Sequence, residues 1–173
     1  IFNGELLWST QLPWYYLPKW ILISTPEFIL LGFLICTVSL IRYLPKPVKS
    51  KQLFLELFVF FILIFPIVYV LIIGANLYSG VRQMLFVLPV LAILSSVGVY
   101  RLLQMDIKKP IRISALLIFF LLMILPVKHQ AESFPVDYVY FNAISGGNKS
   151  AWSEQEYDYY FHSIKKSSTY LIN

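Results

Sequence analysis

Four long runs of hydrophobic residues dominate the chain, and its charged residues lie mainly between and after them. The runs cover residues 20–41, 53–74, 84–103 and 111–127. A bilayer core about 30 Å thick takes roughly 20 apolar residues in a helix. Because an unpaired backbone group in lipid costs several kcal/mol, every run is predicted to be helical. The pattern therefore predicts an all-α polytopic membrane protein with four transmembrane helices.

Composition supports this class. The chain is 58% hydrophobic and only 13% charged, whereas soluble domains carry about 25% charged residues. A chain of 173 residues has too little volume to bury so much apolar surface in a water-soluble core. Prolines interrupt the predicted spans, and a kink is expected at each of Pro26, Pro66, Pro89 and Pro126.

Positive charge orients the predicted bundle. Eight of the 14 Lys and Arg residues lie in two short stretches, 42–51 and 101–112, against one acidic residue, Asp106. Short loops rich in Lys and Arg stay in the cytoplasm. Both chain ends are therefore expected on the non-cytoplasmic side of a bacterial or archaeal plasma membrane or of the endoplasmic reticulum. The basic balance marks orientation and not a nucleic-acid partner.

The flanking segments are predicted to lie on the outer side. Residues 1–19 form an aromatic segment, read either as an interfacial belt or as one wall of a lipid-substrate groove. Residues 128–173 form a small, tyrosine-rich tail of mixed structure that docks on the bundle, with an extended part at 134–142 and a helix at 153–171. Residue 1 is Ile, so the chain is expected to be a piece of a longer protein.

Three motifs occur in order along the chain. They are residues 12–16 (LPWYY) with 23–26 (ISTP), residues 76–83 (NLYSGVRQ) with 86–89 (FVLP), and residues 137–142 (DYVYFN) with 146–147 (GG) and 156–160 (EYDYY). Together they resemble the C-terminal part of GT-C type membrane glycosyltransferases that use polyprenyl- or dolichyl-phosphate sugars. This family includes the protein O-mannosyltransferases and the lipid A aminoarabinose transferase. Gln83 and Tyr160 depart from the pattern, where His and Trp are expected.

The resemblance implies a function and its partners. The donor would be an isoprenoid-phosphate sugar in membrane lipid, and no separate cofactor is implied. The family has more spans than four and a catalytic acid in the first outer loop. Both would lie in a missing N-terminal part of the same protein. We therefore expect no catalytic residue in this chain and no activity from the chain alone.

Arg82 is the leading candidate for substrate binding. It is the lone cation in the predicted outer loop 75–83, and a guanidinium can bind a phosphate through a planar two-pronged contact. The alternative is an interfacial anchor that reaches lipid head groups. Asn76 and Tyr78 of the same loop are expected to donate hydrogen bonds to the substrate, and Trp14 and Tyr15 to hold the isoprenoid.

Glu27 is the other candidate, since an acid inside a span usually faces a partner or a water-filled cavity. Arg82 or Lys19 is the expected partner. Glu56 and Arg101 lie near the predicted cytoplasmic ends and are expected to extend to the interface. His129 and His162 look isolated, and no spacing matches a metal site. The sequon at Asn148 marks a conditional glycosylation site.

The function predicted from the sequence is that of the C-terminal membrane module of a glycosyltransferase. The module helps to move a sugar from a lipid-phosphate carrier to an acceptor hydroxyl on the outer face. The alternative is a non-enzymatic membrane subunit or a transporter fragment. A transporter would favour internal repeats, and the four runs show no convincing repeat.

Overall fold

The computed structural model describes residues 1–43, 51–77, 80–133 and 140–156, together with residues 164, 168, 170 and 171. Over these residues the regular structure is helical, apart from isolated bridges that pair Phe2 with Glu5 and Gln155. This confirms an all-α fold. The elements are α1 (Tyr16–Ser24), α2 (Glu27–Tyr43), α3 (Lys51–Ile73), η1 (Arg82–Met84), α4 (Val87–Gln104), α5 (Lys109–Ser133), η2 (Ala143–Ser145) and α6 (Gly147–Glu154).

Three helices, α3, α4 and α5, are long and apolar enough to cross a membrane. The number rises to four if α1 and α2 together form one broken span. These apolar helices indicate an integral membrane protein. The helix α5 extends well beyond the predicted end of the fourth span at residue 127, as far as Ser133.

The prediction of one continuous helix over residues 20–41 is wrong. The helix α1 ends at Ser24, and α2 starts at Glu27 with its axis bent by 114° from that of α1. Thr25 between them has an extended backbone, with ψ at 130°. Pro26 explains the break, because proline has no N–H to donate and disfavours a helical conformation in the residue before it.

The other prolines do not break their helices. Pro66 and Pro126 lie inside α3 and α5, which continue past them. Pro89 lies in the first turn of α4, where an N–H would have no partner within the helix. The proline pattern therefore predicts where a break is permitted and not where it occurs.

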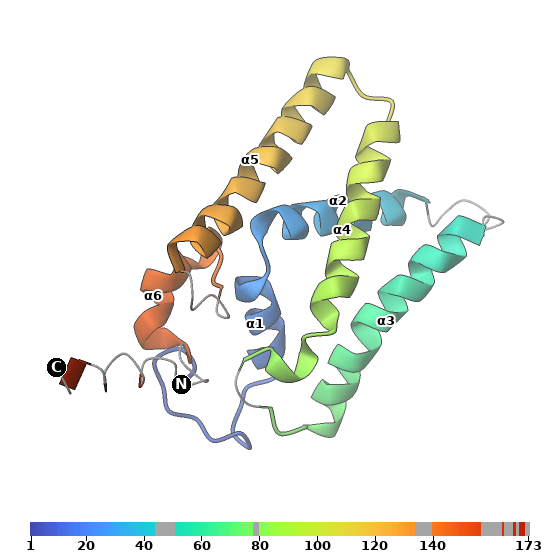
Figure 1. Ribbon diagram of the computed structural model, residues 1–173. Coiled ribbons are helices and arrows are strands. Elements are labelled where there is room, and N and C mark those ends of the chain that lie inside the picture. The colour runs from blue at the N-terminus through green and yellow to red at the C-terminus, as the bar shows by residue number, and fades with distance from the viewer. Residues whose placement is uncertain are drawn as a thin grey trace.

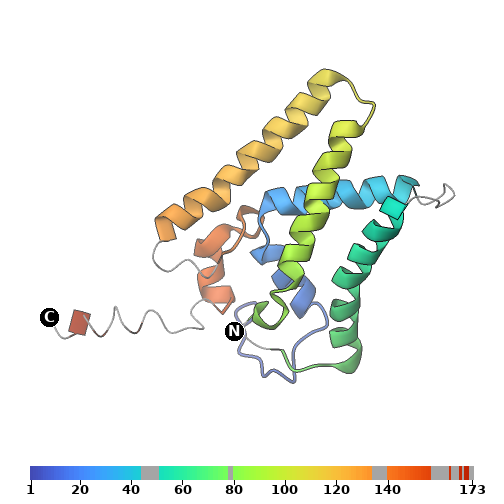
Figure 2. The same ribbon diagram turned by 45° about the vertical axis from the view of Figure 1, so that its right-hand side comes forward.

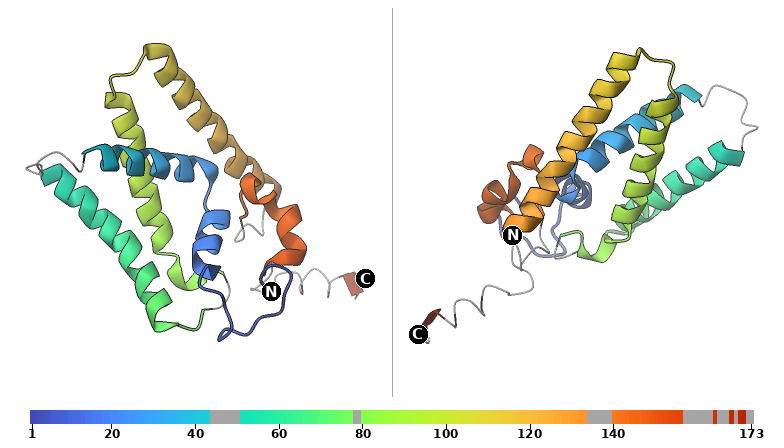
Figure 3. Two further views of the ribbon diagram at one scale, coloured as in Figure 1. Left: turned by 180° about the vertical axis from the view of Figure 1, so that it is seen from behind. Right: turned by 45° about the horizontal axis from the view of Figure 1, so that its top comes forward.

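The helices α2 and α4 cross at the centre of the molecule, with α3 on one side and α1 below the crossing (Figures 1 and 3). The helices α4 and α5 diverge from their short connection, as Figure 2 shows. The helix α6 lies near the chain's N-terminus and the end of α5 (Figure 1). The basic ends of α4 and α5 lie away from this region.

Backbone contact between α2 and α4 is unusually close. A Cβ atom added to Gly98 would lie 2.0 Å from the Gly32 carbonyl oxygen, and one added to Gly32 would lie 2.0 Å from Ser95 Oγ. Ser95 Oγ also donates a hydrogen bond of 3.4 Å to the Phe28 carbonyl. Lipid supplies no hydrophobic drive to bring helices together, so their association depends on close van der Waals contact. Small residues permit that contact.

The helix α1 is the most buried part of the fold. Leu17 and Trp20 are buried in a cluster with Val87 and Leu91 of α4. The Trp20 ring lies 5.5 Å from the ring of Phe141, between centroids. The described part of the tail therefore packs against α1, about 120 residues earlier in the chain.

An ion pair joins three helices near their basic ends. Arg101 of α4 binds the Glu56 carboxylate of α3, and its Nη1 donates a 2.9 Å hydrogen bond to Ser39 Oγ of α2. Glu56 and Ser39 are buried. The expectation that Arg101 and Glu56 extend to the interface is therefore wrong. In apolar surroundings each charge is more stable beside the other than alone.

Loss of one partner should destabilise the bundle more than loss of both. Arg101→Met leaves the Glu56 carboxylate buried without its cation, and should lower the free energy of unfolding by about 3–5 kcal/mol. The double variant Arg101→Met/Glu56→Leu should recover most of this loss. Thermal unfolding in detergent measures the series, and Arg42→Met is the exposed control. A double variant no more stable than Arg101→Met would contradict a direct pair.

Candidate functional site

The break between α1 and α2 leaves backbone carbonyls that need donors. In lipid, such groups must be satisfied within the protein. Ser24 Oγ donates to the Trp20 carbonyl at 2.6 Å, and Thr25 Oγ1 donates to the carbonyl of Ile21. The Leu22 carbonyl would accept from residue 26 in a continuous helix, but that residue is proline. The Leu22 and Ile23 carbonyls therefore require donors from elsewhere.

Asn142 of the tail supplies these donors. Its side-chain Nδ2 donates to the carbonyl oxygens of Leu22 at 2.7 Å and Thr25 at 2.9 Å. Its backbone N–H donates to the Ile23 carbonyl at 2.8 Å. The residue is 1% exposed. Asn142 thus supplies hydrogen-bond donors to carbonyls at the end of α1 for which α1 itself has no donor.

Glu27, the first residue of α2, holds the same part of the tail. Its carboxylate accepts hydrogen bonds from Tyr140 Oη at 3.0 Å and from the backbone N–H of Ala143. The side chain is buried, and it lies at the helix N-terminus, where the dipole stabilises negative charge. The expectation that Arg82 or Lys19 pairs with Glu27 is wrong, because both donors come from the tail. Lys19 instead binds Asn3 Oδ1.

Further polar groups surround Tyr140. The ring of His129, near the end of α5, lies 5.2 Å from the Tyr140 ring in an edge-on arrangement. Asn148 Oδ1 accepts from the Phe141 N–H at 3.0 Å, and Asn148 Nδ2 lies 3.3 Å from a His129 ring nitrogen. His129 is therefore not isolated. The Asn148 amide, which glycosylation of the sequon would modify, already contacts Phe141 and His129 within the fold.

The environment of Tyr140 keeps it protonated. Burial raises the pKa of its hydroxyl, and the hydrogen bond to Glu27 and the negative charge of that residue raise this pKa further. Tyr140 therefore remains a donor to Glu27 at every physiological pH. The contact between tail and α2 does not depend on titration of this hydroxyl.

An apolar groove of about 740 Å³ lies in the angle between α1 and α2. Glu27 is the charged side chain in its lining, at the corner where the two helices meet. On α2 the lining includes Leu30, Leu31 and Leu34, and Leu91 of α4 also lines the groove. Other lining residues include Pro18, Ile21 and Leu22 of α1, Leu63 and Ile67 of α3, Leu122 of α5, and Ile144 of η2.

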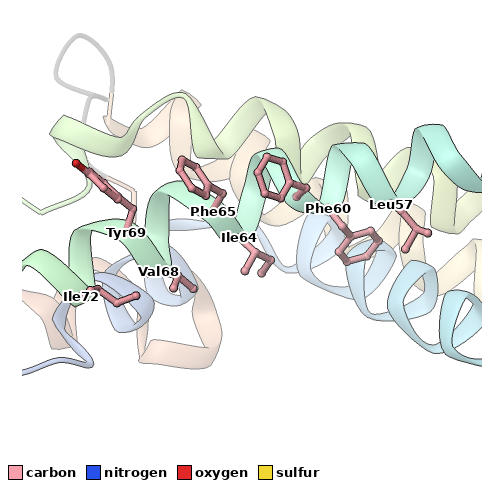
Figure 4. Close-up of a pocket in the computed structure, with 8 residues that line it drawn as sticks. Leu57, Phe60, Ile64, Phe65, Val68, Tyr69 and Ile72 are labelled. Carbon is pink, nitrogen blue, oxygen red and sulfur yellow. The ribbon is translucent and has the colours of Figure 1, made fainter.

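A second hollow of about 410 Å³ runs along the outside of α3 alone (Figure 4). Its lining includes Phe61, Phe65 and Tyr69, whose rings follow one another at centroid distances of 5.2 and 5.9 Å. A surface made by one helix face, with no convergent polar group, is typical of contact with lipid chains. The α1–α2 groove is the better candidate for a specific site.

The sequence-predicted site residues do not form one cluster in the part of the chain described. Arg82, in η1, and Asn76 are both exposed, and Tyr78 lies outside the described residues. Trp14 is 74% exposed and packs edge-on against Tyr15 at the start of α1. Glu27, the first residue of α2, lies beyond the other end of α1.

The loop that carries Arg82 contacts the opposite face of α1 from the groove. Gly80 N–H donates to Tyr16 Oη at 3.1 Å, and the Gly80 backbone packs on the Trp20 ring. Tyr16 and Trp20 lie about half a turn from Pro18 and Ile21, which line the groove. The loop and the groove thus lie on opposite sides of the same short helix.

Sequence reasoning missed Asn142, Tyr140, His129 and Asn148 as partners in one network. Pro26 signals that a carbonyl loses its donor, but the sequence does not say which distant residue replaces it. Among the described residues, no group of three or more His, Cys, Asp or Glu side chains is placed to hold a metal ion. Comparison with protein-family models, curated proteins and solved structures finds no match to this chain.

Replacement of Glu27 by glutamine should loosen the tail. The variant removes the negative charge that strengthens both hydrogen bonds, and should cost about 1–3 kcal/mol of local stability. Hydrogen exchange should then show faster exchange at the Ala143 amide, while amides in α4 keep their protection. Glu132→Gln is the matched control, because its pair with Lys128 is exposed. Unchanged exchange at Ala143 would remove Glu27 from the docking contact.

Proposed function

We propose that this chain is the C-terminal membrane module of a glycosyltransferase that uses a lipid-phosphate-linked sugar, and that the α1–α2 groove binds part of the apolar chain of that lipid. The groove carries the proposal. It is wide, almost entirely apolar, formed by several elements, and closed at one corner by hydrogen-bonded polar groups. Sites for amphiphilic ligands have this combination of apolar walls and a few oriented polar groups.

Arg82 binds the phosphate in this proposal. A guanidinium at the phosphate stabilises the charge that the leaving group gains as the sugar departs. Arg82 and the groove lie on opposite sides of α1. A single long lipid that reaches both passes round the N-terminal end of this helix, where Trp14 and Tyr15 are exposed. These two aromatic residues therefore contact the isoprenoid between its head and the groove.

The orientation completes the proposal. The basic connections lie in the cytoplasm, and α6, the α1–α2 corner and the Arg82 loop lie on the outer side. The acceptor hydroxyl approaches from that side. The group that accepts the hydroxyl proton is assigned to another part of the protein, and Glu27 is not given that role because both its oxygens already accept hydrogen bonds from the tail.

A second candidate is a non-enzymatic membrane subunit, and one observation favours it. The helix α5 has 25 residues and buries none of them in this chain. Its apolar surface is available to other transmembrane helices as well as to lipid. A subunit of this kind would bind a partner through α5 and would not select polyprenyl lipids over ordinary phospholipids.

Filling the groove should weaken lipid binding. Leu34 is 58% exposed in the groove, and Leu34→Trp should lower the affinity for undecaprenyl phosphate by about tenfold, because a bulky ring displaces part of the lipid chain. Binding of radiolabelled undecaprenyl phosphate to the full-length protein in phospholipid nanodiscs measures this. Leu121→Trp, on α5 and 62% exposed, is the control. Equal affinities for both variants would refute the groove as the lipid site.

Arg82 should matter through the shape of its side chain as well as its charge. In the full-length protein, Arg82→Ala should lower sugar transfer by about 100-fold, and Arg82→Lys should recover only part of this, because an ammonium lacks the two-pronged geometry. Transfer assays with a polyprenyl-phosphate sugar measure the series, and Arg42→Ala tests general loss of surface charge. Normal activity of Arg82→Ala would reduce Arg82 to an interfacial anchor.

A further inference from the structure

The N-terminal segment of the chain is folded against α1 and the tail. Phe2 is buried, and its backbone N–H and carbonyl bond to the backbone of Glu5 at 2.9 and 3.1 Å. Gly4 N–H donates to the carbonyl of Glu154 in the tail at 2.9 Å. Lys19 Nζ of α1 lies over the Phe2 ring, 5.4 Å from its centroid. The start of the segment is therefore joined to two other parts of the fold.

The loop that follows, residues 5–15, packs on the connection between α3 and α4. Leu7 and Leu12 of the loop line a small cavity of about 70 Å³ together with Leu77, which follows α3 in the chain. The loop and the end of α3 lie at the same end of the molecule in Figures 1 and 3. Because α3 and α4 are each long and apolar enough to cross the membrane, the segment that connects them lies at a membrane surface. The loop packed on it lies at the same level.

The loop turns its apolar side chains in two directions. Leu7 and Leu12 pack against the core cluster of buried residues. Leu6 and Trp8, on either side of Leu7, are 85% and 77% exposed. The inward pair holds the loop on the fold, and the outward pair is presented to the surroundings.

Exposed apolar residues continue from the loop onto the ends of the neighbouring helices. Ile72 near the end of α3, and Leu85 and Phe86 just before α4, are all at least half exposed. These helix ends contact lipid in the membrane, and a continuous exposed apolar surface of this kind marks a contact with a membrane or a protein. The loop therefore extends a surface that already faces lipid.

Polar side chains are mixed with the apolar ones in this loop, which favours lipid over a protein partner. Glu5, Thr10 and Gln11 are all exposed. The core of a protein interface is depleted of charged residues, whereas the head-group layer, about 5–8 Å thick on each side of the apolar bilayer core, keeps such groups hydrated. Tryptophan favours the same layer, because its ring is apolar and its N–H is polar.

We propose that residues 5–15 form an interfacial anchor, in which Leu6 and Trp8 insert into the head-group layer of the outer leaflet. The partner is the phospholipid of the bilayer itself. Because the loop leads directly into α1, the anchor sets the depth at which α1 enters the membrane. This role does not depend on the function proposed for the α1–α2 groove, which uses neither Leu6 nor Trp8.

Nitroxide labels at Leu6→Cys and Trp8→Cys measure the depth of the loop. The labels are compared in the full-length protein in phosphatidylcholine nanodiscs, with no other cysteine present. For each label, the rate of collision with oxygen, which concentrates in lipid, is divided by the rate with a water-soluble nickel chelate. This ratio should be severalfold higher at both positions than at Thr10→Cys, an exposed polar position of the same loop.

Two results would overturn the proposal. Ratios no higher than that of Thr10→Cys would show that Leu6 and Trp8 are no deeper in lipid than a polar part of the loop. Labels that neither oxygen nor the chelate reaches would show that the two positions are covered by protein.

A second measurement keeps the native side chain, because a nitroxide label is itself apolar. Protein that contains fluorotryptophan gives a fluorine signal for Trp8, which Trp8→Phe identifies. A phosphatidylcholine with a nitroxide on its head group should broaden this signal more than one with a nitroxide at the end of an acyl chain. The signal of Trp20, which is buried in the fold, should broaden much less with either lipid. Broadening of the Trp8 signal that is not stronger with the head-group nitroxide would remove Trp8 from this layer.

Discussion

The hydrogen bonds that end α1 are the interactions on which the rest of the structure depends. A helix that stops inside apolar surroundings leaves carbonyl oxygens without water to hydrate them. Ser24 and Thr25 satisfy two of these carbonyls with their own hydroxyl groups, and Asn142 satisfies those of Leu22, Ile23 and Thr25 from the tail. Because these donors are available, α1 can stop at Ser24 and α2 can leave at a steep angle.

The groove is a consequence of this angle. A straight helix over residues 20–41 would have no corner, and its apolar side chains would face lipid along one line. With the break, Leu22 and Leu30 line two walls of one hollow, and Glu27 lies where the walls meet. The buried carboxylate is tolerated there because the tail supplies two donors and the start of α2 supplies a favourable dipole.

Two further contacts fix α2, and neither is a large hydrophobic cluster. At Gly32 and Gly98 the backbones of α2 and α4 touch, which maximises dispersion contact between helices that lipid alone would not drive together. Near their basic ends, Arg101 joins Ser39 of α2 to Glu56 of α3. One face of α2 is thus held by α4, and much of the remaining surface of α2 lines the groove, to which α4 adds Leu91. Any chemistry that uses both the groove and Arg82 has to be arranged around α1, which separates them.

The sequence by itself determined the class of protein and the elements α3, α4 and α5. Each is a long apolar run, and in lipid such a run has no alternative to a helix. It also marked Pro26 as a position where a helix can break, and Glu27 as an acid that needs partners. Only the tertiary structure decided that Pro26 breaks the helix while Pro66 and Pro126 do not. The difference lies in the donors, because Asn142, more than 110 residues away, satisfies the carbonyls exposed at Pro26. Likewise the sequence put Glu56 and Arg101 near helix ends, and the fold made them a pair. The reason is the same in both cases. A hydrogen bond or an ion pair between distant segments leaves no local pattern in the sequence, whereas a helix that lies in lipid leaves a long run of apolar residues.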